Sequence, residues 1–547
     1  MKRGSALLVA AALIFGTSMT FSVYGQSGQD RPSGFDQNPN VHQTGNVAAG
    51  RDVFRFETFG NEGFWTDAMR LPQGIAALGG TPVAVLQAGL SLDSDALIAA
   101  FGPGVIGLLA RELETDLSPE NAPLLNNPAN TFRLISANAV IGVVPKDTNR
   151  DGVLNVAAGD KVGATCAMCH TITDGSVFTL PGGGSIGRRL DGRAPHTLNF
   201  GAILAAANNS RAYYPVLQLA LSANGGKSLG RAPTGLTENS TEAEVDAYLL
   251  NPAFYPIGMF DDTPDGNGDP MHNVPLFRTD LAAPWGSEGA IQFLDNFSNL
   301  VYTALLDPTN LTTPGGTAFL RTLGGDAAGQ EIVDDYVKVL RDTGVTGYPF
   351  TQVSTHPMPG TEPGPLGIRV DNQKLLDMNA YLDSLQAPRG AAEDLNAVGQ
   401  GRAQFRTNCT FCHDVDQSRF VPFGVVPMKV IFPGDNPVVL LPQRKPPLNP
   451  ILDTPGNIFQ NPINIFDDKM AVVNASLRGL ERGTVLPLLL DLARKPVFLH
   501  DNSVPNLDAL LNPARGAAAP HAFYLNSPQE RENMSAFLRS LTAEPRR

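Results

Sequence analysis

All four cysteines of this chain lie in two copies of the pattern Cys-x-x-Cys-His, at 166–170 and 409–413. Two thiols separated by two residues, on a turn that enters a helix, can reach the two vinyl groups of one porphyrin. The histidine that follows then places its imidazole under the iron. The pattern therefore predicts two covalently attached c-type haems. The expected haem-binding residues are the two thiols and the histidine of each copy: Cys166, Cys169 and His170, and Cys409, Cys412 and His413.

Two other chemistries use paired cysteines. A zinc site would need the two pairs close together in the chain, whereas they lie roughly 240 residues apart. A dithiol of the thioredoxin type does not need a histidine directly after its second cysteine, yet a histidine follows both pairs in a chain with only 8 histidines. Both observations favour haem over zinc or a redox disulfide.

The amino terminus predicts export. Two basic residues precede an apolar run from Ala6 to Phe15, and small residues near Gly25 offer a cleavage site. Residues 1–25 are therefore expected to be a secretory signal peptide. An uncleaved anchor is the alternative, but this run is shorter than the roughly 20 residues that a membrane span needs. We expect a mature protein in the periplasm, where c-type haem is attached, with no membrane span after the signal is removed.

Composition limits the class of protein and its partners. The chain has 547 residues, of which 42% are hydrophobic, and this content is sufficient for ordinary globular cores. A net charge of -13 argues against nucleic acid or an anionic membrane surface as a partner. The 55 glycines and 44 prolines predict long ordered loops between modest helices, of the kind that shield a large cofactor.

An internal repeat suggests two similar units. The segment Asp377-Met-Asn-Ala-Tyr-Leu-Asp-Ser-Leu reappears as Asn533-Met-Ser-Ala-Phe-Leu-Arg-Ser-Leu, and apolar residues recur in both at helical spacing. Each haem motif is thus followed by a similar closing helix, as a cytochrome c fold requires. We expect a mainly α protein with two cytochrome c-like haem domains, at 144–388 and 395–547, joined by long loops. Residues 26–143 are expected to form an N-terminal helical extension that caps the first domain.

In its order of motifs, the chain resembles the bacterial di-haem cytochrome c peroxidases and their relatives. These relatives include di-haem rubber oxygenases and the enzymes that mature a tryptophan-derived quinone cofactor. The resemblance is carried by the signal peptide, the first haem motif, a proline-rich bridge, the second haem motif, Ser476-Leu-Arg-Gly479 and the segment 496–507. It covers roughly 400 residues as a motif match.

The resemblance implies a closed second haem. In the family, the segment that corresponds to 496–507 supplies the sixth ligand of that haem, and in peroxidases the ligand is methionine. Here that position is Leu499, which has no donor atom, so the adjacent His500 is the candidate, as in relatives that resemble the rubber oxygenases. Two histidine ligands would give a low-spin iron suited to electron transfer. Alternatively, His500 is a turn residue, and Met428 or Met470 ligates.

The same resemblance implies that the first haem is the reactive one. His170 would be its proximal ligand, and Trp285 and Glu288 are candidates for the family's inter-haem tryptophan and distal acid. Trp285 is displaced by two residues from the expected position. Asn310 occupies the position of the family's distal glutamate, and an amide cannot act as a general base.

The remaining histidines share no spacing, and each is expected to be an ordinary surface or loop residue. They are His42, His196, His272, His356 and His521. His196, in Asp191-Gly-Arg-Ala-Pro-His196, is the one most worth following.

A calcium site is also suggested. A loop from residue 147 has oxygen donors at positions one, three, five and nine and a glycine at position six, as calcium loops have. Position twelve is alanine rather than glutamate, so an aspartate two residues later is expected to close the shell. A plain turn rich in aspartate and asparagine is the alternative. The candidate ligands are Asp147, Asn149, Asp151, Asn155 and Asp160.

These observations together predict a periplasmic di-haem c-type oxidoreductase. Its second haem would transfer electrons, and its first would react with peroxide or dioxygen. A small redox protein of the cytochrome c or cupredoxin type is the expected electron partner. The alternatives are a di-haem electron carrier that catalyses no reaction, and a di-haem oxygenase acting on an apolar substrate.

Overall fold

The structure is a computed structural model of the whole chain, and its description covers most of the residues after position 43. The described residues are 44–226, 228–268, 270–279, 285, 291, 293–355, 364–410, 413, 425–427, 483–485, 487–499, 502, 504–516, 521 and 523–543. The protein is mainly helical, with 46% helix and 9% strand, which confirms the predicted mainly α class. Among the described residues, no helix is both long enough and apolar enough to cross a membrane.

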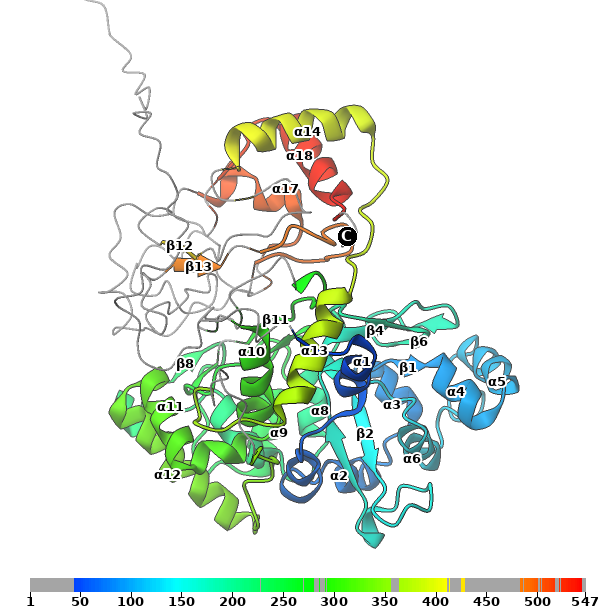
Figure 1. Ribbon diagram of the computed structural model, residues 1–547, viewed down its shortest axis with the longest axis vertical. Helices are drawn as coiled ribbons and strands as arrows, with labels where there is room; N and C mark the ends of the chain where they lie inside the picture. The colour runs from blue at the N-terminus through cyan, green and yellow to red at the C-terminus, as the bar shows by residue number, and fades with distance from the viewer. Residues whose placement is uncertain are drawn as a thin grey trace, which may run out of the picture.

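Buried hydrophobic residues of the described part form two clusters, and each belongs to a separate unit (Figure 1). The larger unit contains α1 (Val47–Phe56), α2 (Leu71–Ala77), α3 (Pro82–Gln87), α4 (Ser94–Phe101), α5 (Gly104–Leu113), α6 (Pro128–Ser136), α7 (Ala167–His170), α8 (Phe200–Ala205), α9 (Glu242–Leu249), α10 (Leu294–Leu300), α11 (Pro314–Gly324), α12 (Asp326–Asp342) and α13 (Asn372–Ser384). The smaller unit contains α14 (Leu395–Asn408), α17 (Leu507–Leu510) and α18 (Pro528–Ser540).

The strands are short and form small separate sheets. The strands are β1 (Leu92–Asp93), β2 (Val143–Lys146), β3 (Lys161–Ala164), β4 (Thr171–Thr173), β5 (Phe178–Thr179), β6 (Ser185–Gly187), β7 (Arg189–Asp191), β8 (Leu229–Gly230), β9 (Met259–Phe260), β10 (Asn267–Gly268), β11 (Met271–His272), β12 (Val425–Pro427) and β13 (Gly483–Val485). The order β1-β6-β5 forms a three-stranded sheet, and the others pair as β2 with β3, β4 with β7, β8 with β10, β9 with β11 and β12 with β13. Two of these pairs, β2–β3 and β4–β7, flank the first haem motif.

Local sequence signals account for the two helices of the internal repeat. Asp371 caps α13, because its side chain accepts a hydrogen bond from the backbone N of Lys374. Ser527 and Glu530 form a capping box around the start of α18, with Pro528 in its first turn. The prediction that both repeat segments are helical is confirmed.

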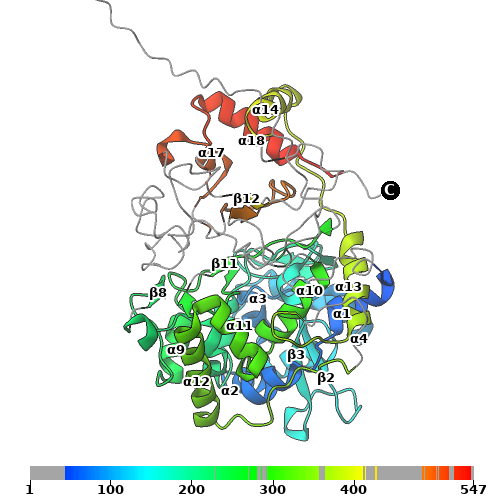
Figure 2. The ribbon, with the colours of Figure 1, turned by 60° about the vertical axis from the view of Figure 1, so that its left-hand side comes forward.

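A glycine allows α1 to approach α13 closely (Figures 1 and 2). A Cβ atom at Gly50 would lie only 1.8 Å from the backbone oxygen of Asp377, so no larger residue fits without moving one helix. One turn later, the rings of Phe54 and Tyr381 pack with their centroids 5.8 Å apart. The helix before the first haem motif is therefore locked against the first repeat helix.

The smaller unit repeats this arrangement between α14 and α18. A Cβ atom at Gly401 would lie 2.1 Å from the backbone oxygen of Asn533. One turn later, the rings of Phe405 and Phe537 pack with their centroids 5.3 Å apart. The four residues stand at the same spacings as their counterparts in α1 and α13, so the two units share one helix crossing.

The position of α1 bears on how the chain is divided. Its residues fall in the segment 26–143, which we predict to be an extension, yet α1 packs on α13 as α14 packs on α18. The first hydrophobic cluster likewise extends from Val53 to Leu382. Residues of this segment thus contribute to the unit that carries the first haem motif, and the domain boundaries remain predictions.

The helix crossing of the smaller unit can be tested with two glycines of α14. Gly401→Ala is expected to lower the free energy of unfolding by about 1–3 kcal/mol, because the added methyl group meets backbone atoms of α18. The control Gly399→Ala adds a methyl group with no atom within 4 Å and should raise it by about 0.5–1 kcal/mol. Urea unfolding followed by circular dichroism measures both, and equal effects would contradict the close approach.

Candidate haem sites

The first Cys-x-x-Cys-His motif forms a short helix between two strands. Cys166 is the residue before α7, and the backbone N of His170 donates to its carbonyl oxygen at 3.1 Å. The strand β3 leads into this helix and β4 leaves it. Cys166 and Cys169 are half-buried and pack against the large hydrophobic cluster. The motif thus lies on a turn that enters a helix, which is the arrangement that two thioether bonds to one porphyrin require.

The imidazole of His170 is oriented by the backbone. Its Nδ1 donates a hydrogen bond to the carbonyl oxygen of Val274 at 2.9 Å. Because a carbonyl can only accept, this bond places the proton on Nδ1 and leaves the lone pair on Nε2. Burial lowers the pKa of His170 to about 4, although the bond to Val274 opposes this shift. A neutral imidazole with a free Nε2 and an anchored Nδ1 has the form of an iron ligand.

Both thiols of this motif lie where a charged sulfur is disfavoured. Burial raises the pKa of Cys166 to about 11 and that of Cys169 to about 12. The Sγ of Cys166 donates to the hydroxyl of Tyr302 at 3.4 Å, and that hydroxyl donates to the carbonyl of Glu57 at 3.2 Å. Zinc binding and nucleophilic thiol chemistry both need a thiolate. An uncharged sulfur suits a thioether, so these residues fit covalent haem better than zinc or a redox dithiol.

Asp191 ties the motif to the crossed helices. Its side chain, only 1% exposed, accepts from Arg55 Nε of α1 at 2.6 Å and from the Tyr381 hydroxyl of α13 at 2.5 Å. Its other carboxylate oxygen accepts from the hydroxyl of Thr171 at 3.0 Å. Thr171 follows His170 directly, and its strand β4 pairs with β7, which ends at Asp191. One carboxylate therefore fixes where the imidazole lies relative to α1 and α13.

The two ends of a long insertion meet beside the same motif. The chain leaves α1 after Phe56 and returns at Thr165, whose hydroxyl donates to the carbonyl oxygen of Arg55 at 3.2 Å. The end of α1 therefore lies beside Cys166, although more than a hundred residues separate them in the sequence. In the smaller unit, α14 runs directly into Cys409.

The second motif begins at the end of α14. The backbone N of Cys409 donates to Phe405 O at 2.8 Å, and that of His413 donates to Cys409 O at 2.9 Å. Cys409 packs against the smaller hydrophobic cluster, and burial lowers the pKa of His413. Cys412 lies outside the described residues. The described part of this motif shares with the first the hydrogen bond from the backbone N of the histidine to the carbonyl oxygen of the first cysteine.

Several predicted residues lie where their role is not described. Glu288 and His500, like the alternative ligands Met428 and Met470, lie outside the described residues. Trp285 is described: its ring packs on Phe297 of α10, with centroids 6.3 Å apart, and its backbone pairs with Ile291. The observed role of Trp285 is packing, and its place between the haems remains a prediction.

Asn310, which the motif resemblance aligns with a distal glutamate, lies in a buried turn and stabilises its backbone. Its side-chain Nδ2 donates to Asp307 O at 3.0 Å and to the hydroxyl of Thr351 at 2.8 Å. The carboxylate of Asp307 accepts from the backbone N of Phe350 at 2.9 Å and of Thr351 at 2.7 Å. Burial raises the pKa of Asp307. These side chains hold the backbone together, which agrees with the expectation that Asn310 supplies no base.

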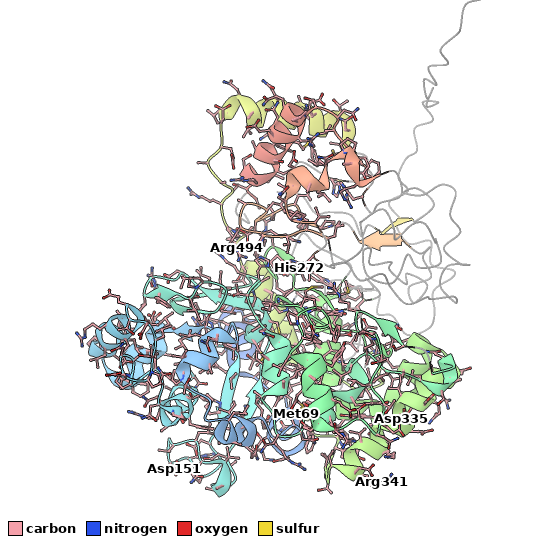
Figure 3. All side chains as sticks on the ribbon, turned by 180° about the vertical axis from the view of Figure 1, so that it is seen from behind. Met69, Asp151, His272, Asp335, Arg341 and Arg494 are labelled. Carbon is pink, nitrogen blue, oxygen red and sulfur yellow. The ribbon has the colours of Figure 1, made fainter. Side chains whose placement is uncertain are left out.

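The loop between β2 and β3 brings three of the five predicted calcium ligands together. Carboxylate oxygens of Asp147, Asp151 and Asp160 lie within 4.8 Å of one another. The two asparagines are engaged within the loop: Asn149 donates to Asp151 at 3.0 Å, and Asn155 caps the short helix that follows it. Figure 3 shows Asp151 at the end of the larger unit that is far from Arg494 and His272. Exposed acidic groups also cluster without a metal, so calcium remains a prediction.

Histidines and cations meet at the contact between the units (Figure 3). Arg494 of the smaller unit donates to the carbonyl oxygen of Ala194 at 3.3 Å. The rings of His196 and His272 stack nearby, with centroids 5.2 Å apart. Burial, and then the positive charges of Arg494 and Lys495, lower the pKa of His196 to about 3. His196 lies in a loop, as predicted, but its Nδ1 is buried and it is not an ordinary surface histidine.

Comparison of the chain with protein-family models, with curated proteins and with solved structures finds no match. The peroxidase family therefore stays a resemblance between motifs. The functional argument depends on the chemistry of the residues described above.

Sequence reasoning missed the residues that hold the first motif in place. Asp191 and Val274 carry no motif, and their importance comes from contacts between residues far apart in the chain. A signal for the helix crossing was present, however. The pattern Gly-Arg-x-x-Phe occurs at 50–54 and again at 401–405, ahead of each haem motif.

The buried histidine at the contact between the units predicts a pH dependence of stability. Because the folded-state pKa of His196 lies below its ordinary value, the unfolded chain takes up this proton first as the pH falls below about 6.5, and stability declines towards pH 3. Between pH 7 and pH 5, the wild type is expected to lose at most about 2 kcal/mol more than His196→Gln. Urea unfolding at both pH values measures this difference, and equal losses would show that His196 is protonated in the folded protein.

Proposed function

We propose that this protein is a periplasmic di-haem c-type oxidoreductase that passes electrons between a small redox protein and peroxide or dioxygen. The observation that carries the proposal is the first motif. There, two half-buried thiols in surroundings that favour their uncharged form, and a backbone-anchored imidazole, lie together at α7 and the residue before it. The signal-like amino terminus supports export to the periplasm, and the residues it comprises lie outside the described ones.

Covalently bound haem would supply one-electron transfer and, at an iron with an open coordination position, reduction of peroxide or activation of dioxygen. Cys166 and Cys169 would hold the first group, and His170 would ligate its iron. Cys409 and Cys412 would hold the second, with His413 as the iron ligand.

The surroundings of His170 support a tuned redox site. The carbonyl oxygen of Val274 keeps the imidazole proton on Nδ1, which makes the ligating nitrogen more electron-rich. The carboxylate of Asp191 fixes the strand that follows the histidine, so the ring cannot drift relative to the two crossed helices. The surroundings of both half-buried thiols have a lower dielectric constant than water. Each of these factors contributes to the reduction potential of a haem iron.

The contact between the units supports electron transfer from one motif to the other. Arg494 bonds to Ala194 in the segment that leads from β7 to His196. Asp191, which positions the first motif, lies at the start of the same segment. The second unit thus touches the first beside its haem motif, as transfer between two haems within one chain requires.

Haem content tests the attachment sites. The wild type is expected to carry two haems per chain, and the double variant Cys166→Ser with Cys169→Ser should carry one, because serine forms no thioether. The matched control, Cys409→Ser with Cys412→Ser, should also carry one. Pyridine haemochrome absorbance relative to protein concentration measures this ratio. An unchanged ratio in either variant would contradict covalent attachment at that motif.

Electron paramagnetic resonance of the ferric protein tests whether the two haems have different roles. We expect one low-spin signal, and one high-spin signal that changes when peroxide is added. His170→Gly should change the high-spin signal selectively, because that imidazole would ligate the first iron, whereas His413→Gly should alter the low-spin signal. Two low-spin signals that peroxide does not affect would support an electron carrier and contradict the enzyme.

A further inference from the structure

A second histidine faces the imidazole of the second haem motif. The ring centroids of His413 and His521 lie 6.2 Å apart, and the ring planes are inclined at 48°. His413 comes shortly after the end of α14, whereas His521 lies in the loop before α18. By sequence, His521 is an ordinary loop histidine. Its position opposite the predicted iron ligand is a finding of the structure.

His521 is half-buried, and neighbouring aromatic rings pack against it. Its Nδ1 is buried and has no hydrogen-bond partner among the described residues. The edge of Phe523 packs on the ring, with centroids 5.5 Å apart, and Phe405 packs on the far partner His413 at 6.3 Å. The backbone of His521 has a φ of 54°, a left-handed conformation that is uncommon for a residue other than glycine. A half-buried imidazole on a left-handed backbone, with a buried Nδ1 that has no partner among the described residues, is a candidate functional group.

The spacing of the two rings matches two ligands of one metal. A histidine nitrogen binds a transition metal at about 2.0 Å and lies about 1.1 Å from the centroid of its own ring, so two imidazoles on opposite sides of one metal have centroids about 6.2 Å apart. Aromatic pairs that share no metal also occur at this distance, as Tyr248 and Phe254 do at 6.3 Å, so the distance alone does not single out a metal. The placement of the His413 and His521 rings is thus compatible with a shared metal, and the buried Nδ1 of His521, which has no partner among the described residues, points to one.

We propose that His521 is the sixth ligand of the second haem iron, opposite His413. This inference rests on the proposed function, because it requires haem at the second motif. It replaces His500, the candidate from the family resemblance, with a residue of the loop before α18. With an imidazole on each side, this iron is low-spin and closed to peroxide and dioxygen, so the second haem only transfers electrons.

The spin state of the second haem tests the ligand directly. In His521→Gly, the low-spin signal of the ferric protein should fall to background and the high-spin signal should double, while the chain keeps two haems. Adding free imidazole should restore the low-spin signal, because imidazole occupies the place of the deleted side chain. His500→Gly is the matched control and should keep the wild-type spectrum.

A second variant covers the case in which His521→Gly does not accumulate. His521→Met keeps a ligand atom, and it should replace the bis-histidine signature in near-infrared magnetic circular dichroism with that of histidine and methionine. An unchanged bis-histidine signature in His521→Met, or a low-spin signal lost in His500→Gly instead, overturns the assignment. A wild-type chain without haem overturns the proposed function as well. A wild type with two haems and an unaltered His521→Gly overturns only the ligand.

Discussion

The close approach of two pairs of helices is the constraint on which the rest of this structure depends. In each unit, a glycine lets one helix touch the backbone of the other, and an aromatic pair one turn later fixes the rotation of the two helices. In the larger unit, Arg55 and Tyr381 project from this crossing onto Asp191, and the strand that ends at Asp191 aligns the strand after His170. The position of the His170 imidazole therefore depends on the close contact between α1 and α13.

The features that were predictable from sequence are those encoded locally. The four thiols and two histidines of the haem motifs, the capping box of α18 and the helical spacing of the repeat all lie within short segments, and the structure has helices where the repeat predicts them. The pairing of Gly50 with Asp377 and of His413 with His521 joins distant segments, so periodicity and spacing do not reveal it. A loop histidine without a motif gives no signal until the chain is folded.

The described parts of the two haem motifs share an electrostatic character. Burial favours uncharged forms of Cys166 and Cys169 and of His170 and His413. The charged groups beside the first motif are paired with each other, as Arg55 and Asp191 are. Where the cysteines and histidines of a motif are uncharged and partly buried, a change in the charge of a bound iron would be weakly screened, so small differences between the two surroundings would give different reduction potentials.

The two ends of the segment between α1 and Thr165 are held together, and this contact determines how many residues the segment can contain. In the smaller unit, helix and motif are joined by the chain itself, and an insertion there would separate them. In the larger unit, they are joined through space by Thr165 and Asp191. Once that bridge exists, the entropy of closing the intervening loop rises only with the logarithm of its length. Additional helices, such as α2 to α6, and an acidic loop can therefore be accommodated in the larger unit without displacing its Cys-x-x-Cys-His motif, whereas in the smaller unit α14 and the motif have to stay contiguous.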